Sequence, residues 1–312
     1  MQDDISLSHY IESLPELPSR PRTGHKGTFG TVFGIGGSRG MAGAVALAGR
    51  AGLVAGAGLV RLAVPDPILE TVAGFYPEIT TLPCPADDQG QFSQTALELL
   101  LHHATSATAI FLGPGLGRSD NIDVLVPLLL RHIRCPVVAD ADALNALASP
   151  ESEHFSLHHF FQSLDNQNLI LTPHPGEFAR LRGQPTPNED SKKSQSERIA
   201  VAKDFARQHG VVLVLKGHES IITNGEIVAL NPTGNPGMAT GGSGDVLTGI
   251  LAALLAQGLA PFDAARVGAF LHGLAGDFAA NRFGEESVTA TSILEAIPEA
   301  FQTVKKFLSV HR

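Results

Sequence analysis

The sequence predicts an α/β fold in which a mostly parallel central sheet is covered by helices. Short apolar stretches of strand length alternate with longer helical stretches, which is the pattern of βαβ units. Glycine-rich or polar clusters follow several of these strands directly, as expected where parallel strands end at the ligand-binding edge of an open sheet. Hydrophobic residues make up 43% of the 312 residues and charged residues 17%, a composition typical of a packed globular protein.

Composition and charge exclude several functional classes. The net charge of −9 argues against a nucleic-acid partner, because binding a phosphate backbone requires a basic face. Cys84 and Cys135 have neither metal-site spacing nor a disulfide framework, which fits a reducing cytoplasm. The N-terminus lacks the apolar stretch of a signal peptide, and no apolar run is long enough to span a membrane. We therefore expect a soluble, cytoplasmic protein. Any anionic ligand would be bound by helix N-termini and a few Lys or Arg side chains.

The N-terminal segment differs in composition from the rest of the chain. Residues 1–23 are polar and contain Pro15, Pro18 and Pro21, so they predict a short helix followed by an extended arm. We expect residues 24–312 to form a single domain. No role for the arm follows from its sequence.

The domain begins with a βαβ unit. A short buried strand starts at Thr31 and runs into a glycine turn, and Leu59–Val64 forms the next strand. Small apolar residues between Met41 and Gly58 predict a helix packed closely on the sheet, so the two strands should be parallel. The glycine turn fits a dinucleotide-binding fingerprint poorly, because Arg39 stands in place of the third glycine. The chain has no Gly-Lys dipeptide, which excludes a Walker A loop.

Further strands, a hairpin and helices complete the predicted fold. Asn224-Gly225 is a favoured turn for a hairpin, and it separates two strands that lead into a glycine-rich loop. The predicted strands are 107–112, 136–140, 169–172 and 211–215, the hairpin strands are 219–223 and 226–230, and the helices are 195–209, 262–283 and 289–308.

The stretch 231–245 carries the strongest functional signal. Its turn-rich loop ends in Gly241, Gly242 and Gly244 and passes abruptly into an apolar helix. Glycines allow close backbone approach, and the unpaired N–H groups of a helix start bind phosphate readily. Asp245 then places a carboxylate next to the bound anion, where it would act as a catalytic base or orienting group. The structural alternative is that Asp245 only caps the helix.

Polar side chains also follow the predicted strands 136–140 and 211–215. Asp140 and Asp142 form the kind of carboxylate pair that binds Mg²⁺, although both could instead cap the next helix. Lys216 would supply positive charge to a ligand, and the Gly217 backbone could lie against phosphate or ribose. Alternatively, Lys216 is simply a solvent-exposed residue at the end of a buried strand.

The strand at 169–172 is followed by a histidine between two prolines. His174 lies on no apolar face, so we weigh a ligand contact against a plain turn residue. Glu177 is interpreted as a first-turn helix charge.

Together these elements resemble the NAD(P)H-hydrate dehydratase family, the carbohydrate-kinase-related domain of the ribokinase-like superfamily. The resemblance covers roughly residues 24–305 and implies a three-layer α/β/α sandwich. The Gly-Gly-x-Gly-Asp element occurs across the superfamily, whereas Thr-Pro-His-Pro-Gly-Glu is more diagnostic of the family. The matching motifs are Lys26-Gly27-x-x-Gly30 with Gly36-Gly37-Ser38, Gly113-Pro-Gly-Leu-Gly117, Asp140-Ala-Asp-Ala-Leu-Asn145, Thr172-Pro-His-Pro-Gly-Glu177, and Gly241-Gly-Ser-Gly-Asp245 preceded by Lys216-Gly217.

The resemblance implies the repair of hydrated nicotinamide cofactors. The 6-hydroxyl of (S)-NADHX or (S)-NADPHX would be phosphorylated by a nucleotide, and elimination of phosphate would restore NADH or NADPH. Bacterial members of the family typically use ADP and eukaryotic ones ATP. Mg²⁺ would bridge the phosphates, with Asp140 or Asp142 as its protein ligands. We also expect a homo-oligomer, and an NAD(P)HX epimerase as a separate protein because this chain leaves no room for an epimerase domain.

By resemblance, the site residues take distinct roles. Asp245 would be the catalytic base and would also contact the substrate. The other implied contacts are Ala44, Gly117 and His174 for the hydrated cofactor, and Lys216, Gly217, His218, Glu219, Ser220, Gly242, Ser243 and Gly244 for the nucleotide.

Two other functional classes stay open. An ATP-dependent kinase for a small vitamin-precursor alcohol would use the same base and anion hole, although the Thr-Pro-His-Pro-Gly-Glu loop counts against it. A nucleotide-sensing protein without catalysis is the third class, and an Asp245→Ala variant would separate it from an enzyme.

Overall fold

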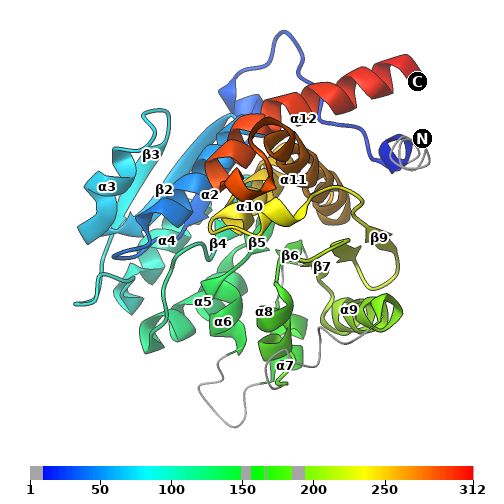
Figure 1. The fold of residues 1–312 in the computed structure, drawn as a ribbon. Coiled ribbons are helices and arrows are strands. Elements are labelled where there is room, and N and C mark those ends of the chain that lie inside the picture. Colours follow the sequence, from blue (N-terminus) through cyan, green and yellow to red (C-terminus); the bar gives the residue numbers. More distant parts are fainter. Residues whose placement is uncertain (1–9, 149–155, 165, 167, 185–193, 312) are drawn as a thin grey trace.

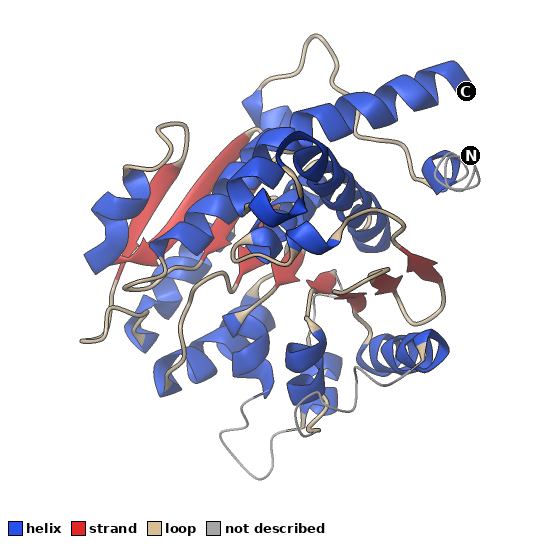
Figure 2. Cartoon of the chain, viewed as in Figure 1, coloured by secondary structure: helices blue, strands red, loops and turns tan. Residues whose placement is uncertain are grey.

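A nine-stranded sheet forms the centre of the molecule, and helices cover both of its faces (Figure 1, Figure 2). This computed structural model describes residues 10–148, 156–164, 166, 168–184 and 194–311. The strand order is β3-β2-β1-β4-β5-β6-β7-β8-β9. The bounds of the strands are β1 Thr31–Ile35, β2 Leu59–Pro65, β3 Thr80–Cys84, β4 Ala109–Leu112, β5 Val137–Ala139, β6 Leu169–Leu171, β7 Val212–Leu215, β8 Ile221–Thr223 and β9 Val228–Leu230.

The strand pairing confirms a mostly parallel sheet. All pairs from β3 through β7 are parallel, and only β7–β8 and β8–β9 are antiparallel. The chain runs outward from β1 to β3 and then returns to place β4 on the other side of β1. Ligands bind at such a reversal of strand order, outside the carboxyl ends of the strands.

Two hydrophobic cores, one on each face of the sheet, hold the layers together. The first core contains α2, α10, α11 and α12, and the second contains residues of α4 through α9. The helices are α2 Ala42–Val54, α3 Leu69–Ala73, α4 Leu97–Ala104, α5 Asp120–His132, α6 Asp142–Ala148, α7 Leu157–Gln162, α8 Pro175–Leu181, α9 Gln195–His209, α10 Ser243–Ala256, α11 Pro261–Phe283 and α12 Ala290–His311; short 3₁₀ helices are η1 Lys26–Phe29, η2 Asp66–Ile68, η3 Gln94–Ala96, η5 Pro236–Met238 and η6 Glu285–Ser287.

Helix α10 is the most deeply buried helix of the first core and fixes the position of its own N-terminus. It packs against both α2 and α11, and every residue from Val246 to Ala256 is buried. A Cβ added at Gly249 would lie only 2.0 Å from the Ala48 carbonyl oxygen of α2, so close packing of these helices requires glycine there. The small residues predicted between Met41 and Gly58 therefore serve contact with α10 as well as with the sheet.

Most predicted elements are confirmed. The parallel βαβ unit, the buried strand β7 and the hairpin β8–β9 occur as expected, and α9 has the predicted bounds. The edge strand β3 went unpredicted, because Pro83 within it removes a hydrogen-bond donor and is typical of edge strands. No helix in the described part of the chain is both long and apolar enough to cross a membrane.

The described part of the predicted N-terminal arm packs onto α11. Residues 10–13 are helical, as predicted, and residues 1–9 lie outside the described residues. Tyr10 stacks on Phe270 with ring centroids 5.4 Å apart, and Arg266 donates hydrogen bonds to the Ser13 carbonyl and hydroxyl. Leu14 is buried in the first core. The segment thus covers the outer side of α11.

Candidate active site

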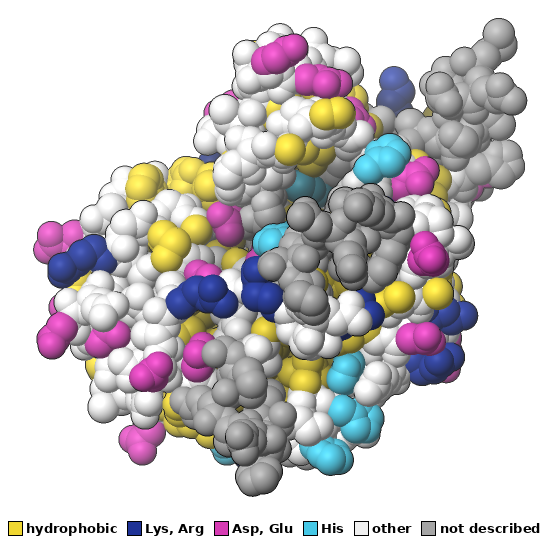
Figure 3. Space-filling view, turned by 60° about the horizontal axis from the view of Figure 1, so that its bottom comes forward, with side chains coloured by type: hydrophobic (Ala, Val, Ile, Leu, Met, Phe, Trp, Pro, Cys, Tyr) yellow, Lys and Arg dark blue, Asp and Glu magenta, His cyan; other side chains and the backbone are white. Residues whose placement is uncertain are grey.

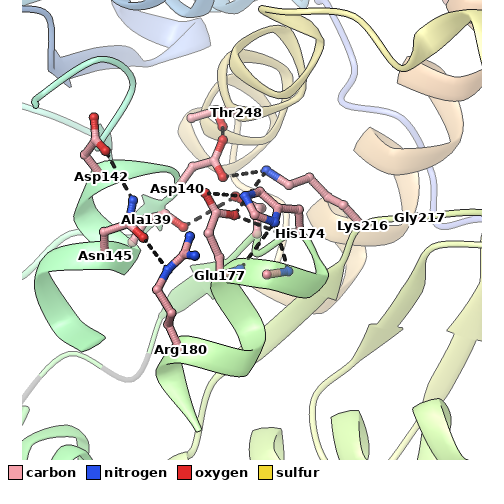
Figure 4. A network of polar contacts seen from close by, with 12 residues as sticks. Ala139, Asp140, Asp142, Asn145, His174, Glu177, Arg180, Lys216, Gly217 and Thr248 are labelled. Carbon is pink, nitrogen blue, oxygen red and sulfur yellow. Dashed lines mark hydrogen bonds and ion pairs between the residues drawn. The ribbon is translucent and has the colours of Figure 1, made fainter. Parts of the chain in front are cut away.

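Asp140 stands at the centre of a polar network at the carboxyl ends of the strands (Figure 4). It follows β5 directly and is 1% exposed. Its Oδ1 accepts a hydrogen bond from Lys216 Nζ at 2.8 Å, and its Oδ2 accepts one from Thr248 Oγ1 at 2.7 Å. The carboxylate thereby connects the end of β7 with the second turn of α10. A buried charge needs such partners, and here both oxygens have one.

Lys216 is the positive charge of the network. Its side chain is 21% exposed and lies 3.9 Å from Glu177 Oε2 in addition to its ion pair with Asp140. Burial lowers the pKa of Lys216, but the carboxylates of Asp140 and Glu177 raise it by more, so the net shift is upward. Lys216 therefore stays protonated at neutral pH and can attract an anion.

Asp245 lies in the first turn of α10, as predicted, but does not cap the helix. The N-cap is Gly242, with φ 88°, and the helix start has no side-chain cap hydrogen bond. Among the described residues no hydrogen bond to the Asp245 carboxylate occurs. Burial raises the pKa of Asp245 to about 7; the negative charge of Asp140 adds to this rise, and Lys216 opposes it. A carboxyl group with a pKa near neutrality and a free oxygen is suited to general-base catalysis.

The start of α10 brings backbone N–H groups next to the Lys216–Asp140 ion pair. A Cβ added at Gly244 would lie 3.3 Å from Lys216 Nζ and 3.6 Å from Asp140 Oδ2, so the backbone passes directly beside the ion pair. The first N–H groups of α10 have no intrahelical acceptor, and the helix dipole favours negative charge at this end. Ser243 contacts His272 of α11 at 3.4 Å from Oγ to Nε2, a histidine that the sequence did not single out.

The preceding loop is fastened to α11. Thr233 Oγ1 donates to the Phe270 carbonyl at 3.0 Å. Asp277 accepts hydrogen bonds from the Gly234 N–H at 3.0 Å and from Asn235 Nδ2 at 2.9 Å. These contacts hold the glycine-rich loop in place before the chain turns into α10.

His174 and Glu177 form a reciprocal cap at the start of α8. His174 Nδ1 accepts from the N–H groups of Gly176 and Glu177, and Glu177 Oε2 accepts from the His174 N–H at 2.8 Å. Burial lowers the pKa of His174, and Lys216 lowers it further, which favours the neutral ring. Because Nδ1 accepts hydrogen bonds, the proton of the neutral ring lies on Nε2. Glu177 is a first-turn residue as interpreted, but burial also raises its pKa to about 7, and it reaches Lys216. Its role extends beyond that of a helix charge.

A second chain of hydrogen bonds extends from Asp142. Asp142 Oδ2 accepts from the Gly117 N–H at 2.9 Å, and Oδ1 accepts from Asn145 Nδ2 at 3.2 Å. Arg180 Nε of α8 donates to Asn145 Oδ1 at 2.9 Å. This chain joins the ends of β4 and β5 to α8, and it fixes the position of the Gly117 backbone.

The remaining predicted residues lie on the same edge of the sheet. The loop Gly217–Ser220 is closed by hydrogen bonds in both directions between Gly217 and Ser220, and His218 and Glu219 are exposed within it. Ala44 lies near the start of α2 against the β4 loop, because a Cβ added at Gly115 would be 3.1 Å from Ala44 Cβ. In the face drawn in Figure 3, acidic, basic and histidine side chains lie close together near the middle.

The two aspartates predicted to bind Mg²⁺ already have protein partners. Both oxygens of Asp140 and both of Asp142 accept hydrogen bonds. Within the described residues, no three His, Cys, Asp or Glu side chains are grouped to hold a metal ion. Each carboxylate still has unused lone pairs, so either aspartate could contribute an oxygen to an ion that is held mainly by phosphates and water.

Comparison with known proteins identifies the family. Residues 32–299 match the family described as NAD(P)H-hydrate dehydratase. The chain belongs to this family. It is 43% identical over 293 residues to the bifunctional NAD(P)H-hydrate repair enzyme of Moorella thermoacetica, an alignment covering 93% of this chain and 53% of that protein. The chain thus spans about half the length of this bifunctional relative.

Other members of the family are similar along most of their length. The ADP-dependent (S)-NAD(P)H-hydrate dehydratase of Neisseria meningitidis is 39% identical over 262 residues, covering 83% of this chain and 80% of that protein. The ADP/ATP-dependent dehydratase of Bacillus subtilis, co-crystallised with ATP/Mg²⁺, superposes with a TM-score of 0.74 and 28% identity, covering 95% of this chain and 97% of that one. These comparisons confirm the ribokinase-like fold.

Proposed function

We propose that this chain dehydrates (S)-NADHX and (S)-NADPHX, the hydrated forms of NADH and NADPH, at the expense of ADP. Family membership supports this reaction class, and the ADP dependence follows the name of the Neisseria relative. The observation that carries the proposal is the Asp245 carboxyl group, whose pKa is about 7, at the start of α10 and beside the Lys216–Asp140 pair.

The reaction proceeds in two steps. Asp245 accepts the proton of the 6-hydroxyl while that oxygen bonds to the terminal phosphorus of the nucleotide, and the nucleotide leaves with one phosphate fewer. The backbone N–H groups of residues 242–244 and the Lys216 ammonium stabilise the charge on the transferring group. The C6–O bond then breaks to release phosphate, a proton leaves the neighbouring ring carbon, and the ring double bond is restored.

The ligands divide between two sides of Asp245. On the β7 side, Lys216 and the loop Gly217–Ser220 hold the nucleotide, together with Gly242, Ser243 and Gly244. On the β4–β6 side, Ala44, Gly117 and His174 contact the hydrated cofactor. Mg²⁺ would neutralise charge on the nucleotide phosphates, with a carboxylate oxygen of Asp142 or Asp140 as its protein contact.

The cellular setting follows from this chemistry. The substrates arise from cofactors of central metabolism, so we place the protein in the cytoplasm. Since the Neisseria relative is named for the (S) epimer, the (R) epimer requires an NAD(P)HX epimerase as a functional partner. We further propose that the protein is a homo-oligomer, to be tested by light scattering.

The test uses purified protein, Mg²⁺ and chemically hydrated NADH, with ADP or ATP added in turn. Recovery of the near-ultraviolet absorbance of NADH that depends on nucleotide is the expected result, with ADP the better donor. No recovery from protein that binds ADP would refute the dehydratase. A stable phosphorylated product from an alcohol substrate would instead support a kinase.

A further inference from the structure

Arg180 carries a positive charge on the β4–β6 side of the site. It lies on α8 and is partly buried, and its Nε–H donates to Asn145 Oδ1 at 2.9 Å (Figure 4). A Cβ added at Gly176 would lie 3.8 Å from Arg180 Nη1, so the guanidinium points back along the helix toward the turn that holds His174. The side chain is thus directed toward the substrate-contacting residues of the proposed function.

The guanidinium of Arg180 lacks a carboxylate partner in the part of the chain that the structure describes. Among the described residues no Asp or Glu forms an ion pair with Arg180, although its effect on the pKa values of His174 and Glu177 places it near both. Lys216, by contrast, is paired with Asp140. A guanidinium has five N–H donors, and the contact with Asn145 uses only one of them. Since no described residue accepts a hydrogen bond from the terminal nitrogens, these donors are available to bind an anion.

The anchoring contact belongs to a chain that ends at a predicted substrate contact. Asn145 donates to Asp142, and Asp142 accepts from the Gly117 N–H. One series of hydrogen bonds therefore sets the positions of the Arg180 guanidinium and the Gly117 backbone relative to each other. An arginine that served only solubility would not need a side chain anchored by this series of hydrogen bonds.

We infer that Arg180 binds a phosphate group of the hydrated dinucleotide through its terminal N–H donors. The inference rests on the proposed function, which supplies a substrate with a diphosphate and, in NADPHX, a 2′-phosphate. Planar guanidinium groups bind phosphate through two parallel hydrogen bonds, and a position fixed by Asn145 reduces the entropy lost on binding. Arg180 is thus a substrate-binding residue, distinct from the Lys216 site for the nucleotide.

The experiment compares Arg180→Gln with Arg207→Gln. Arg207 lies on α9, is exposed and pairs with the exposed Asp204, so its variant makes the same change in net charge away from the site. Dissociation constants for NADHX, NADPHX and ADP are measured by calorimetry without turnover, and steady-state kinetics follow. Arg180→Gln is expected to weaken binding of both hydrates about 10- to 100-fold, with ADP affinity unchanged. Arg207→Gln should match the wild type.

The two substrates separate the possible phosphate sources. An equal loss for NADHX and NADPHX assigns the contact to the diphosphate, and a loss confined to NADPHX assigns it to the 2′-phosphate. Unchanged affinity for both hydrates, or a loss for ADP alone, would overturn the inference. Arg180→Lys keeps the positive charge but loses the planar arrangement of guanidinium donors, so it should show an intermediate loss of affinity for the hydrates. This variant replaces Arg180→Gln in the comparison if Arg180→Gln does not fold. Failure of the wild type to turn over hydrates that it binds would refute the proposed function and leave the Arg180 comparison intact.

Discussion

Asp140→Asn is the most informative single change, because Asp140 supports both the stability and the ionisation of the site. The variant removes a charge whose two oxygens accept hydrogen bonds from Lys216 and Thr248. An asparagine offers one acceptor, so its NH₂ must face either the ammonium or the hydroxyl. Lys216 is then left with Glu177 at 3.9 Å as its remaining carboxylate partner among the described residues.

Breaking such a buried pair costs about 3–5 kcal/mol of folding stability. For a chain of this size the melting temperature should fall by roughly 5–10 °C, measured by differential scanning calorimetry. Thr248→Val is the matched control, because it removes one hydrogen bond but keeps the Asp140 charge. Its expected cost is about 2 kcal/mol, as for other hydrogen bonds to a charged group.

The same variant changes the pH dependence of the reaction. In the proposed mechanism Asp245 must be ionised to accept a proton, so we expect activity to fall as the pH drops through its pKa of about 7. After burial, the negative charge of Asp140 is the largest cause that raises this pKa. Removing the charge lowers the pKa, and the acidic limb of kcat/KM moves to lower pH even though the maximum rate decreases.

The assay records kcat/KM for hydrated NADH over a range of pH and normalises each curve to its maximum. The acidic limb of Asp140→Asn should lie at lower pH than that of the wild type, whereas the acidic limb of Thr248→Val should stay at the wild-type pH. An unchanged or upward limb for Asp140→Asn would refute the electrostatic account of Asp245.

Three further changes test other parts of the site. Asp245→Asn should reduce kcat about 10²- to 10⁴-fold without loss of ADP affinity, and above pH 7 it should raise the melting temperature, since ionising a carboxyl group with a raised pKa destabilises the native state. Gly244→Ala should increase the KM for ADP and lower kcat, because its Cβ would crowd Lys216 Nζ at 3.3 Å; Gly241→Ala, with nothing within 4 Å, is the control. Asp277→Ala should cost about 1–3 kcal/mol in calorimetry and raise the KM for ADP, because it frees the loop at Gly234 and Asn235.

The elements that sequence predicted well are those whose signal is local. Strand β7 is a run of apolar residues buried on both faces, and Asn224-Gly225 specifies the turn between β8 and β9. The strand β3 has no such signal, since it is short, contains Pro83 and is only partly buried. Its place at the edge of the sheet depends on pairing with β2, and no local sequence pattern in β3 predicts that pairing.

For the site, the sequence predicted which residues gather at one edge but not which of them pair. Asp140 was predicted as a Mg²⁺ ligand because it follows a strand, yet its two partners lie 76 and 108 positions further along the chain. Lys216 and Thr248 become the partners of Asp140 because β5 and β7 flank β6 in the sheet and because α10 is buried deeply in the core. Arg180, His272 and Asp277 lie inside helices without a motif, so their contacts with the site appear only once the helices are packed. Position along a strand predicts which residues lie at the carboxyl-end edge of the sheet, whereas the charged contacts that shift the Asp245 pKa depend on tertiary packing.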